Sequence, residues 1–214
     1  TVLSSILALG SALLLRSLLY HIGRRPRWLT VLYQLNLPIP HAVGAIAILL
    51  LCSQSGLLAR LAVAVHFIDA PANFPELVFD RYGIGIILEY LWKTTVFTGV
   101  ILLAALESAS SEHEEGARSL GANAWQRFRY VTLPLLRPAL VSASVLVFAF
   151  TFGGYEVPYL LGQRSNSLLP VLAYREYSRV DLGSRPEAMA ISLVITLIIS
   201  CTVWLYMRFA ERSA

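Results

Sequence analysis

Five long apolar stretches constrain this chain more than any other feature of its sequence. They cover residues 2–20, 32–53, 84–106, 139–161 and 187–207. An α-helix needs about 20 mostly apolar residues to cross the hydrocarbon core of a bilayer, and each stretch is close to that length. Because 57% of the chain is hydrophobic and only 14% is charged, a soluble domain with a charged surface is excluded. We therefore predict an all-α membrane protein, a bundle of about five transmembrane helices.

The loops between these stretches predict the orientation of the chain. Cytoplasmic loops carry an excess of lysine and arginine close to the membrane. The segments after the first, third and fifth stretches hold nine arginines, against six in the other two. We therefore expect the Thr1 end outside, the Ala214 end in the cytoplasm and lipid around the bundle. Residues 56–68 are apolar but too short to cross, and we expect them at the membrane interface. Because the numbering starts without Met inside an apolar run, we also expect residues upstream of Thr1.

Several classes of function gain no support from the motifs. Cys52 and Cys201 lie far apart in apolar stretches, without the spacing of a disulfide framework or a metal site. The histidines are scattered, and neither H-E-x-x-H nor the phosphate-binding G-x-x-x-x-G-K-[ST] occurs. The basic residues lie between apolar runs instead of on one face, so the net charge of +4 does not indicate nucleic acid. We expect no enzyme activity and no cofactor on this chain.

The polar loop of residues 107–137 carries strong local signals for two short helices. Ser111 followed by Glu114 fits a capping box, and the acidic residues around them suit the positive end of a helix dipole. Arg118 lies four residues after Glu114, so the opposite charges share one face. Gly121 suits the end of this first helix, because glycine accepts the left-handed conformation found there.

A second helix is expected after Gly121. Asn123 is placed to cap it, Trp125 and Phe128 recur at near-helical spacing, and Pro134 is expected to end it. Pro138 then suits the first turn of the next span. Exposed aromatics beside arginines are typical of an interface hot spot, but a solvated loop that caps its own helices fits equally well. The residue pattern alone leaves both possibilities open.

The spacing within the loop resembles a known signature. Glu115, Gly116 and Ala117 are followed after three residues by Gly121, and nine residues later by the run V-T-L-P that ends at Pro134. This resembles the cytoplasmic signature E-A-A, three residues, G, nine residues, I-x-L-P of the membrane subunits of binding-protein-dependent ABC importers. Gly116 and the valine of the run depart from the pattern but keep small or β-branched apolar character. The resemblance covers most of the chain and is to the polyamine, iron and sulfate type of permease.

The resemblance implies that residues 1–214 form a single transmembrane domain in the bacterial cytoplasmic (inner) membrane, with a coupling helix between the third and fourth spans. The coupling residues that it implies are Glu115, Ala117, Gly121, Leu133 and Pro134, to which the exposed Trp125 and Phe128 are added. The implied partners are a cytoplasmic ABC ATPase dimer that holds ATP and Mg, a second permease subunit and an extracytoplasmic solute-binding protein. The implied solute is a polyamine, ferric iron, sulfate or a phosphonate. The alternatives are an intramembrane enzyme and a secondary transporter or channel not driven by ATP.

Two sets of residues are candidates for the translocation path. Charged side chains within spans usually face a bundle interior or a polar cavity. Glu89 and Lys93 stand four apart, so they either neutralise each other or border the path. In the run FGGYEVPY two glycines allow close backbone approach, and Pro158 predicts a helix break that suits a gate but equally suits a frayed end. The gate candidates in this run are Gly153, Gly154, Tyr155 and Glu156. We interpret His41 as a hydrogen-bonded core residue.

Overall fold

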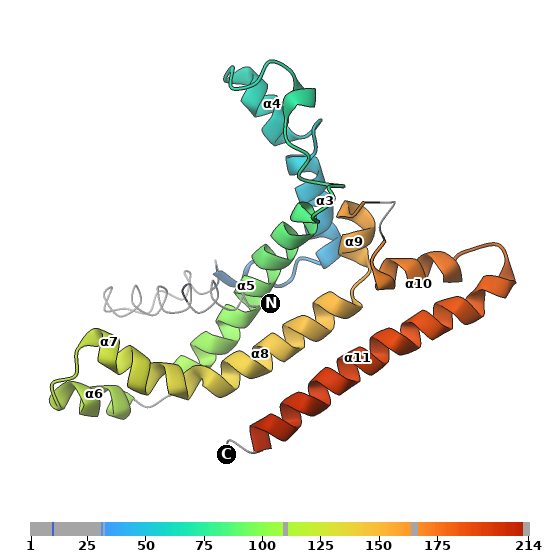
Figure 1. Ribbon diagram of the computed structural model, residues 1–214. Coiled ribbons are helices and arrows are strands. Elements are labelled where there is room, and N and C mark those ends of the chain that lie inside the picture. The colour runs from blue at the N-terminus through green and yellow to red at the C-terminus, as the bar shows by residue number, and fades with distance from the viewer. Residues whose placement is uncertain (1–9, 11–30, 32, 109–110, 164–166, 212–214) are drawn as a thin grey trace. The chain divides into compact units, whose positions relative to one another are not determined.

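A computed structural model describes residues 10, 31, 33–108, 111–163 and 167–211, and every element within these ranges is helical (Figure 1). Four helical segments among them are long and apolar enough to cross a membrane: His41–Ala64, Ile84–Leu106, Ala124–Gly153 and Leu182–Arg208. The all-α class with several membrane spans is therefore confirmed. The predicted first span, residues 2–20, lies outside the described residues apart from Gly10.

The helices follow one another along the chain with short connections. They are α3 (His41–Cys52), α4 (Leu57–Ala64), the 3₁₀ turn η1 (Pro71–Asn73), α5 (Ile84–Ser108), α6 (Ser111–Ser119), α7 (Ala124–Arg127), the π-helical turn η2 (Phe128–Thr132), α8 (Leu133–Gly153), α9 (Glu156–Leu161), α10 (Leu169–Tyr177), the 3₁₀ turn η3 (Leu182–Ser184) and α11 (Arg185–Glu211). They form two compact units, whose boundaries fall inside α5, α8 and α11.

The first unit comprises Thr1–Leu37, Thr94–Phe148 and Tyr206–Ala214. Its core is a small cluster in which Leu102 and Leu106 of α5 pack with Leu136 of α8. These leucines stand four apart on α5, which is the spacing that places two side chains on one helix face. The α6–α7 hairpin therefore emerges from a pair of helices that hold each other by leucine packing.

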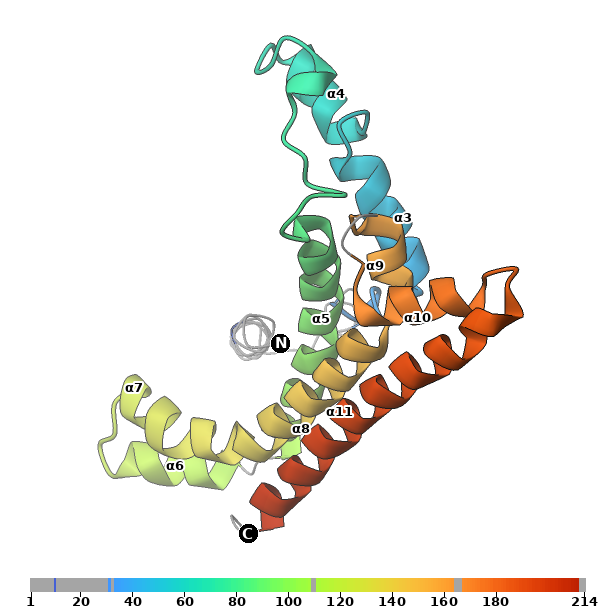
Figure 2. The ribbon, with the colours of Figure 1, turned by 45° about the vertical axis from the view of Figure 1, so that its right-hand side comes forward.

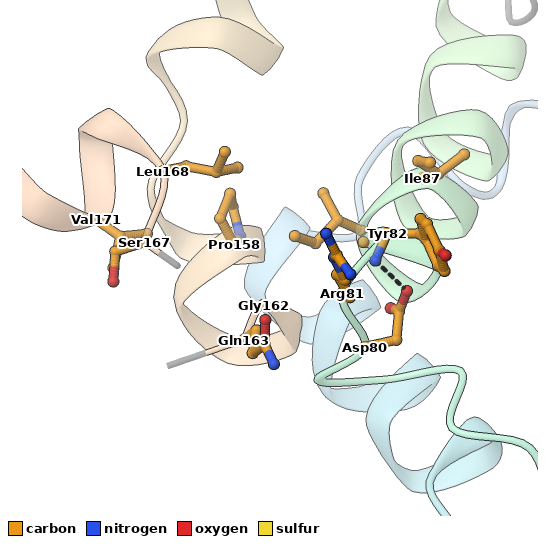
Figure 3. Close-up of a pocket in the computed structure, with 12 residues that line it drawn as sticks. Asp80, Arg81, Tyr82, Ile87, Pro158, Gly162, Gln163, Ser167, Leu168 and Val171 are labelled. Carbon is orange, nitrogen blue, oxygen red and sulfur yellow. Dashed lines mark hydrogen bonds between the residues drawn. The ribbon is translucent and has the colours of Figure 1, made fainter. Parts of the chain in front are cut away.

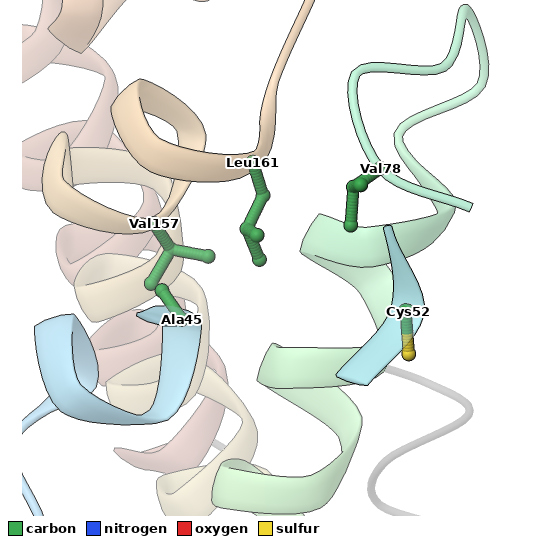
Figure 4. Packing of buried hydrophobic residues seen from close by; sticks show 5 residues of the cluster. All are labelled: Ala45, Cys52, Val78, Val157 and Leu161. Atoms are coloured by element: carbon green, nitrogen blue, oxygen red, sulfur yellow. The ribbon is translucent and has the colours of Figure 1, made fainter. Parts of the chain in front are cut away.

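The second unit comprises Pro38–Lys93 and Ala149–Leu205. Its core joins α3 to α9 through Ala45, Cys52, Val78, Val157 and Leu161, shown in Figure 4. Cys52 is a buried residue of this core, in line with its interpretation as an ordinary helix residue. The apolar side of α9 is thus fixed on α3. Its opposite side, with Glu156 and Tyr159, is exposed.

The second span differs from its predicted bounds of residues 32–53. Residues 31, 33 and 34 are helical, but the helix is interrupted over residues 35–40 and resumes at His41, because Pro38 and Pro40 lack the N–H groups that a helix interior needs. The apolar residues of 56–68 form α4, which resumes after a four-residue interruption and extends the segment to Ala64. Gly56 allows this resumption, because a Cβ there would lie 2.7 Å from two carbonyl oxygens of α3.

The fourth span also begins and ends earlier than predicted. The helix α8 starts at Leu133 and stops at Gly153, whereas the hydropathy pattern predicts residues 139–161. The break falls at Gly154 and Tyr155, and not at Pro158 as we predicted. Pro158 is buried inside the first turn of α9, where a missing N–H breaks no helical hydrogen bond.

Candidate functional site

The hairpin of α6 and α7 is closed by a tight backbone turn at Gly121. The Gly121 N–H donates to the Arg118 carbonyl and the Ala122 N–H donates to the Ala117 carbonyl, both over 3.0 Å. This pair of bonds is the Schellman motif, which requires a left-handed residue at its centre. Gly121 supplies it with φ +82°, so the predicted helix end is confirmed. Figures 1 and 2 show α6 lying alongside α7 in this hairpin.

The second arm of the hairpin begins at Asn123, as predicted. Its side-chain oxygen accepts from the Gln126 N–H over 2.8 Å, and the Gln126 side chain accepts from the Asn123 N–H over 2.9 Å. This reciprocal capping box satisfies two backbone donors at the start of α7. Two side chains and one glycine thus fix the whole turn, and the hairpin is a defined element instead of a flexible linker.

Removing the cap is expected to loosen the hairpin without displacing the spans. Asn123→Ala loses the side-chain acceptor and should cost about 1 kcal/mol of local helix stability. Amide hydrogen exchange in residues 124–127 should then speed up about fivefold, which is that energy expressed as a rate ratio. Asn123→Ser keeps an acceptor and is the matched control. Equal exchange rates in the two variants would show that Asn123 does not hold the turn.

The tip of the hairpin presents apolar side chains to its surroundings. Leu120 is 90% exposed, Trp125 68% and Tyr130 75%. The Trp125 and Phe128 rings lie 5.7 Å apart, which orders the aromatic surface. Arg127 is half-buried and donates from Nη1 to the Ala122 carbonyl over 3.0 Å, so it braces the turn. Sequence reasoning missed Leu120 and Tyr130, although an apolar residue beside a helix-ending glycine is a recognisable signal.

The return from the hairpin to the membrane is continuous helix, and the predicted stop at Pro134 is wrong. The turn η2 shifts the hydrogen-bond ladder, because the Leu133 N–H donates to the Phe128 carbonyl five residues back. Pro134 and Pro138 both lie inside α8 as the chain enters the span. Short π-helical turns are strained and occur often at functional sites. Leu133 is half-buried and Pro134 is exposed at this junction.

The start of the hairpin exposes its acidic side. Glu115 is exposed on α6 and Ala117 is half-buried. The hydroxyl of Ser119 donates to the Glu115 carbonyl over 3.0 Å near the end of the helix. The predicted capping pair Ser111 and Glu114 lies outside the residues whose side chains the structure describes. The coupling residues expected from the sequence therefore gather, where described, on one helical hairpin and its return.

The second unit buries the two charged residues of the third span. Glu89 is fully buried, and the Nδ1 of His41 lies 2.9 Å from its Oε1, so the ring donates to the carboxylate. Lys93 is 8% exposed and donates from Nζ to the Ile39 carbonyl. The two partners, His41 and the Ile39 carbonyl, lie at or just before the start of α3. The third span is thus linked to α3 by hydrogen bonds. The interpretation of His41 as a hydrogen-bonded residue agrees with this geometry.

The helix break of the fourth span lies beside a cluster of tyrosines. Tyr155 stacks on Tyr174 of α10 with ring centroids 4.8 Å apart, and Tyr159 meets Tyr174 edge-on at 5.5 Å. Gly153 and Glu156 are exposed at the break. Gly154 is needed for close packing, because a Cβ there would lie 3.1 Å from the Tyr90 hydroxyl. Sequence reasoning missed Tyr159 and Tyr174, since no local pattern connects the two helices.

A cavity of about 240 Å³ lies in the second unit between the start of α5 and the segment that joins α9 to α10 (Figure 3). It is lined by Asp80, Arg81, Tyr82, Gly83, Ile86, Ile87, Pro158, Gly162, Gln163, Ser167, Leu168 and Val171. Asp80 accepts from the Tyr82 and Ile84 N–H groups, both over 2.8 Å. The carboxylate therefore holds the backbone at the start of α5.

Comparison with protein families gives one match over nearly the whole chain. The family described as the binding-protein-dependent transport system inner membrane component matches residues 2–213. The inner membrane ABC transporter permease protein YnjC of Escherichia coli is 28% identical over 205 residues, which are 94% of this chain and 38% of that protein. The trehalose/maltose transport system permease protein MalF of Thermococcus litoralis is 30% identical over 118 residues, 53% of this chain and 40% of that protein.

A solved structure shares the fold. It belongs to a bacterial ABC transporter involved in the import of the acidic polysaccharide alginate, and it aligns with a TM-score of 0.65 over 95% of this chain and 79% of that chain. The sequence identity is 18%, so this likeness concerns the arrangement of helices. The chain spans about half the length, or less, of the curated relatives that it matches.

Proposed function

This chain belongs to the family of binding-protein-dependent transport system inner membrane components, and from that premise we propose that it lines part of the solute path of an ATP-driven importer. The family is the non-catalytic membrane part of such systems and carries no cofactor, as we expected from the sequence. The inner membrane is its location. We propose that residues 1–214 act as one transmembrane domain, with the Thr1 end outside and the Ala214 end in the cytoplasm.

The observation that carries the coupling role is the closed hairpin at Gly121. A joint that transmits motion between two bodies has to move as a unit, and this element is fixed by a Schellman turn, a capping box and an arginine brace. Its exposed Leu120, Trp125 and Tyr130 supply the apolar and aromatic surface that protein interfaces bury at their centre. We propose that this surface docks on a cytoplasmic ABC ATPase.

The other partners follow from the same proposal. One ATPase dimer needs two membrane subunits, so a second permease chain, identical or different, completes the path. The family description names a binding protein, which we propose delivers solute from outside the cytoplasm. Hydrolysis of ATP with Mg then takes place on the ATPase, and this chain converts the motion into alternating access.

We propose a carbohydrate-type solute. Both relatives above whose names state a solute handle carbohydrates, trehalose or maltose in one case and alginate in the other. The polyamine, ferric iron, sulfate or phosphonate expected from the sequence resemblance gains no support from them. Among the path candidates, the exposed residues at the break from Gly153 to Glu156 suit a solute surface better than Glu89 and Lys93. The latter two are buried against the start of α3.

The proposal predicts strict dependence on a separate ATPase. The chain should co-purify with an ABC ATPase. Vesicles of the complex should take up solute only when Mg-ATP is present on the side of the membrane where the ATPase is bound. Replacing the catalytic glutamate of that ATPase is the matched control and should abolish uptake. The competing function, a secondary transporter or channel, predicts uptake driven by an ion gradient without ATP. Purification without an ATPase together with ATP-independent uptake would refute the importer proposal.

A further inference from the structure

We propose that Tyr155, Tyr159 and Tyr174 form an aromatic platform on which a carbohydrate ring stacks as it passes the helix break. This inference rests on the proposed function and names a contact surface for its solute. Tyr155 caps the start of α9, Tyr159 lies in α9 and Tyr174 lies in α10, and the ring centroids of Tyr155 and Tyr159 lie 4.8 and 5.5 Å from that of Tyr174. They are 39%, 49% and 41% exposed, so roughly half of each side chain is open to a ligand.

The backbone beside the platform indicates water instead of lipid. The regular helix is interrupted at Gly154 and Tyr155, within the apolar stretch of residues 139–161 and directly after the span Ala124–Gly153. Non-helical backbone at membrane depth is tolerated only where protein covers it or where it lines a water-filled cavity. The exposed carboxylate of Glu156 adds to this, because charged side chains inside a membrane also face polar cavities. Both features argue against lipid at the break, and the proposal places an aqueous space along the exposed side of α9.

The side of α9 opposite the tyrosines is packed into the core and fixes the platform. Val157 and Leu161 on the opposite side of α9 are 2% and 0% exposed in the core with α3. The Phe79 N–H donates to the Leu161 carbonyl over 2.8 Å and holds the end of α9. A preorganised surface loses little conformational entropy when it binds a ligand. The tyrosines are thus displayed by a fixed helix, as a binding surface requires.

The chemistry of the platform fits a neutral sugar ring. A pyranose has an apolar C–H face surrounded by hydroxyl groups, and a tyrosine offers a ring face with partial negative charge and a phenol that both donates and accepts. Anions are disfavoured by the ring faces and by Glu156. Tyr155 and Tyr174 lie nearly parallel, at 20°, which suits stacking on a flat ring. A cation is also attracted to a tyrosine ring face and to Glu156, so spermidine is the competing ligand in the experiment below.

A cysteine-accessibility experiment on the assembled transporter tests the platform. Tyr159→Cys is made in a Cys201→Ala background, which removes the exposed native thiol and leaves Cys52 buried. A membrane-impermeant maleimide is applied with and without the carbohydrate that wild-type vesicles take up from a panel of maltose, trehalose and related disaccharides. We expect labelling of Tyr159→Cys, slowed at least about threefold by that carbohydrate and unchanged by spermidine or sulfate. The background variant alone should stay unlabelled.

Each other outcome of the labelling has a definite meaning. Absence of labelling would place the tyrosines against lipid and overturn the inference. Labelling that no carbohydrate slows would show a water-lined surface without a sugar site and would also overturn it. Protection by spermidine alone would assign the platform to a cation. If wild-type vesicles take up no carbohydrate of the panel, the proposed solute class fails first and the platform fails with it.

Substitution of Tyr174 gives an independent measurement. Tyr174→Leu keeps apolar volume but removes the ring, and we expect uptake per ATP hydrolysed to fall about tenfold. Tyr174→Phe keeps the ring and should stay within about twofold of wild type. Tyr177→Leu is the matched control, because Tyr177 lies on the same helix and is 56% exposed, but its ring meets Arg185 instead of the platform. Equal losses in Tyr174→Leu and Tyr177→Leu would overturn the inference.

Discussion

Replacing Gly121 with leucine is expected to lower solute uptake about tenfold while ATP hydrolysis continues. The residue has φ +82°, and a side chain in this left-handed conformation costs about 1–2 kcal/mol. A Cβ at Gly121 would meet no atom within 4 Å, so the penalty is one of backbone conformation and not of space. To relieve it, the turn must open, which breaks the Gly121 and Ala122 hydrogen bonds that close the hairpin. A hairpin that is no longer rigid would move with the ATPase but would not transmit the motion to the membrane spans.

Two controls separate this mechanism from a general loss of structure. Gly121→Asn should retain most of the uptake, because asparagine tolerates the left-handed region better than leucine. Gly116→Ala lies in equally open space inside α6 and should be harmless or slightly stabilising. ATP hydrolysis and uptake are measured in the same vesicles for all variants. Unchanged uptake in Gly121→Leu, or equal loss in Gly121→Asn, would contradict a conformational role for this glycine.

The hairpin could be predicted from sequence because its determinants are local. The Gly121 turn and the Asn123 capping box involve residues no more than five positions apart, so spacing and residue type were sufficient. The signature spacing also indicated the importer family, which the match over residues 2–213 confirms. Prediction failed at two prolines. Pro134 does not end a helix, because the chain continues through a π-helical turn into α8, and Pro138 lies inside α8 instead of in its first turn. No simple sequence pattern announces such a turn.

The ends of the spans were harder, because hydropathy reports composition and not backbone hydrogen bonding. Residues 32–40 are apolar enough to belong to a span, yet two prolines interrupt the helix, which resumes at His41. In the fourth span the glycine pair ends the helix before Pro158. Pro158 is the third residue of α9, where its missing N–H removes no helical hydrogen bond. The helix therefore continues through Pro158, and the interruption falls at the glycine pair.

The partners of the buried and aromatic residues could not be predicted, because they depend on tertiary packing. His41 and Glu89 are 48 residues apart in the chain. Helical spacing suggested Lys93 as the neighbour of Glu89, and the packing of α3 on α5 adds His41 as a hydrogen-bond partner. The same holds for Tyr155, just before α9, and Tyr174 of α10, whose rings meet through the packing of the second unit. Such contacts require the fold.

Gly44 explains why α3 and α5 come close enough for the His41–Glu89 contact. A Cβ at this position would lie 2.9 Å from the Trp92 ring and 3.2 Å from Oε1 of Glu89. The absence of a side chain lets the backbone of α3 approach a fully buried carboxylate. Small residues play this role widely at contacts between membrane helices. The hydrogen bond from His41 is then made at 2.9 Å, within the normal range.

Removing His41 is expected to destabilise the second unit strongly. Glu89 is fully buried, its Oε1 is paired with His41, and its Oε2 has no hydrogen-bond partner among the residues that the structure describes. His41→Leu therefore leaves a buried carboxylate without its donor, which costs about 2 kcal/mol. This figure lies below the range of about 3–5 kcal/mol for a fully buried pair, because the His41 side chain is 35% exposed. Denaturant unfolding of the purified protein in detergent measures the change in the free energy of unfolding.

The double variant His41→Leu/Glu89→Leu distinguishes a lost charge partner from lost packing. Replacing both members of a buried pair by apolar residues of similar size is often neutral, so the double variant should recover most of the stability lost in His41→Leu. Glu89→Gln alone should be mild, because an amide keeps hydrogen-bonding capacity without a charge to desolvate. If the double variant is as unstable as the sum of the two single leucine variants, the sites are uncoupled. The His41–Glu89 contact would then contribute nothing to stability, and apolar packing would hold α3 on α5.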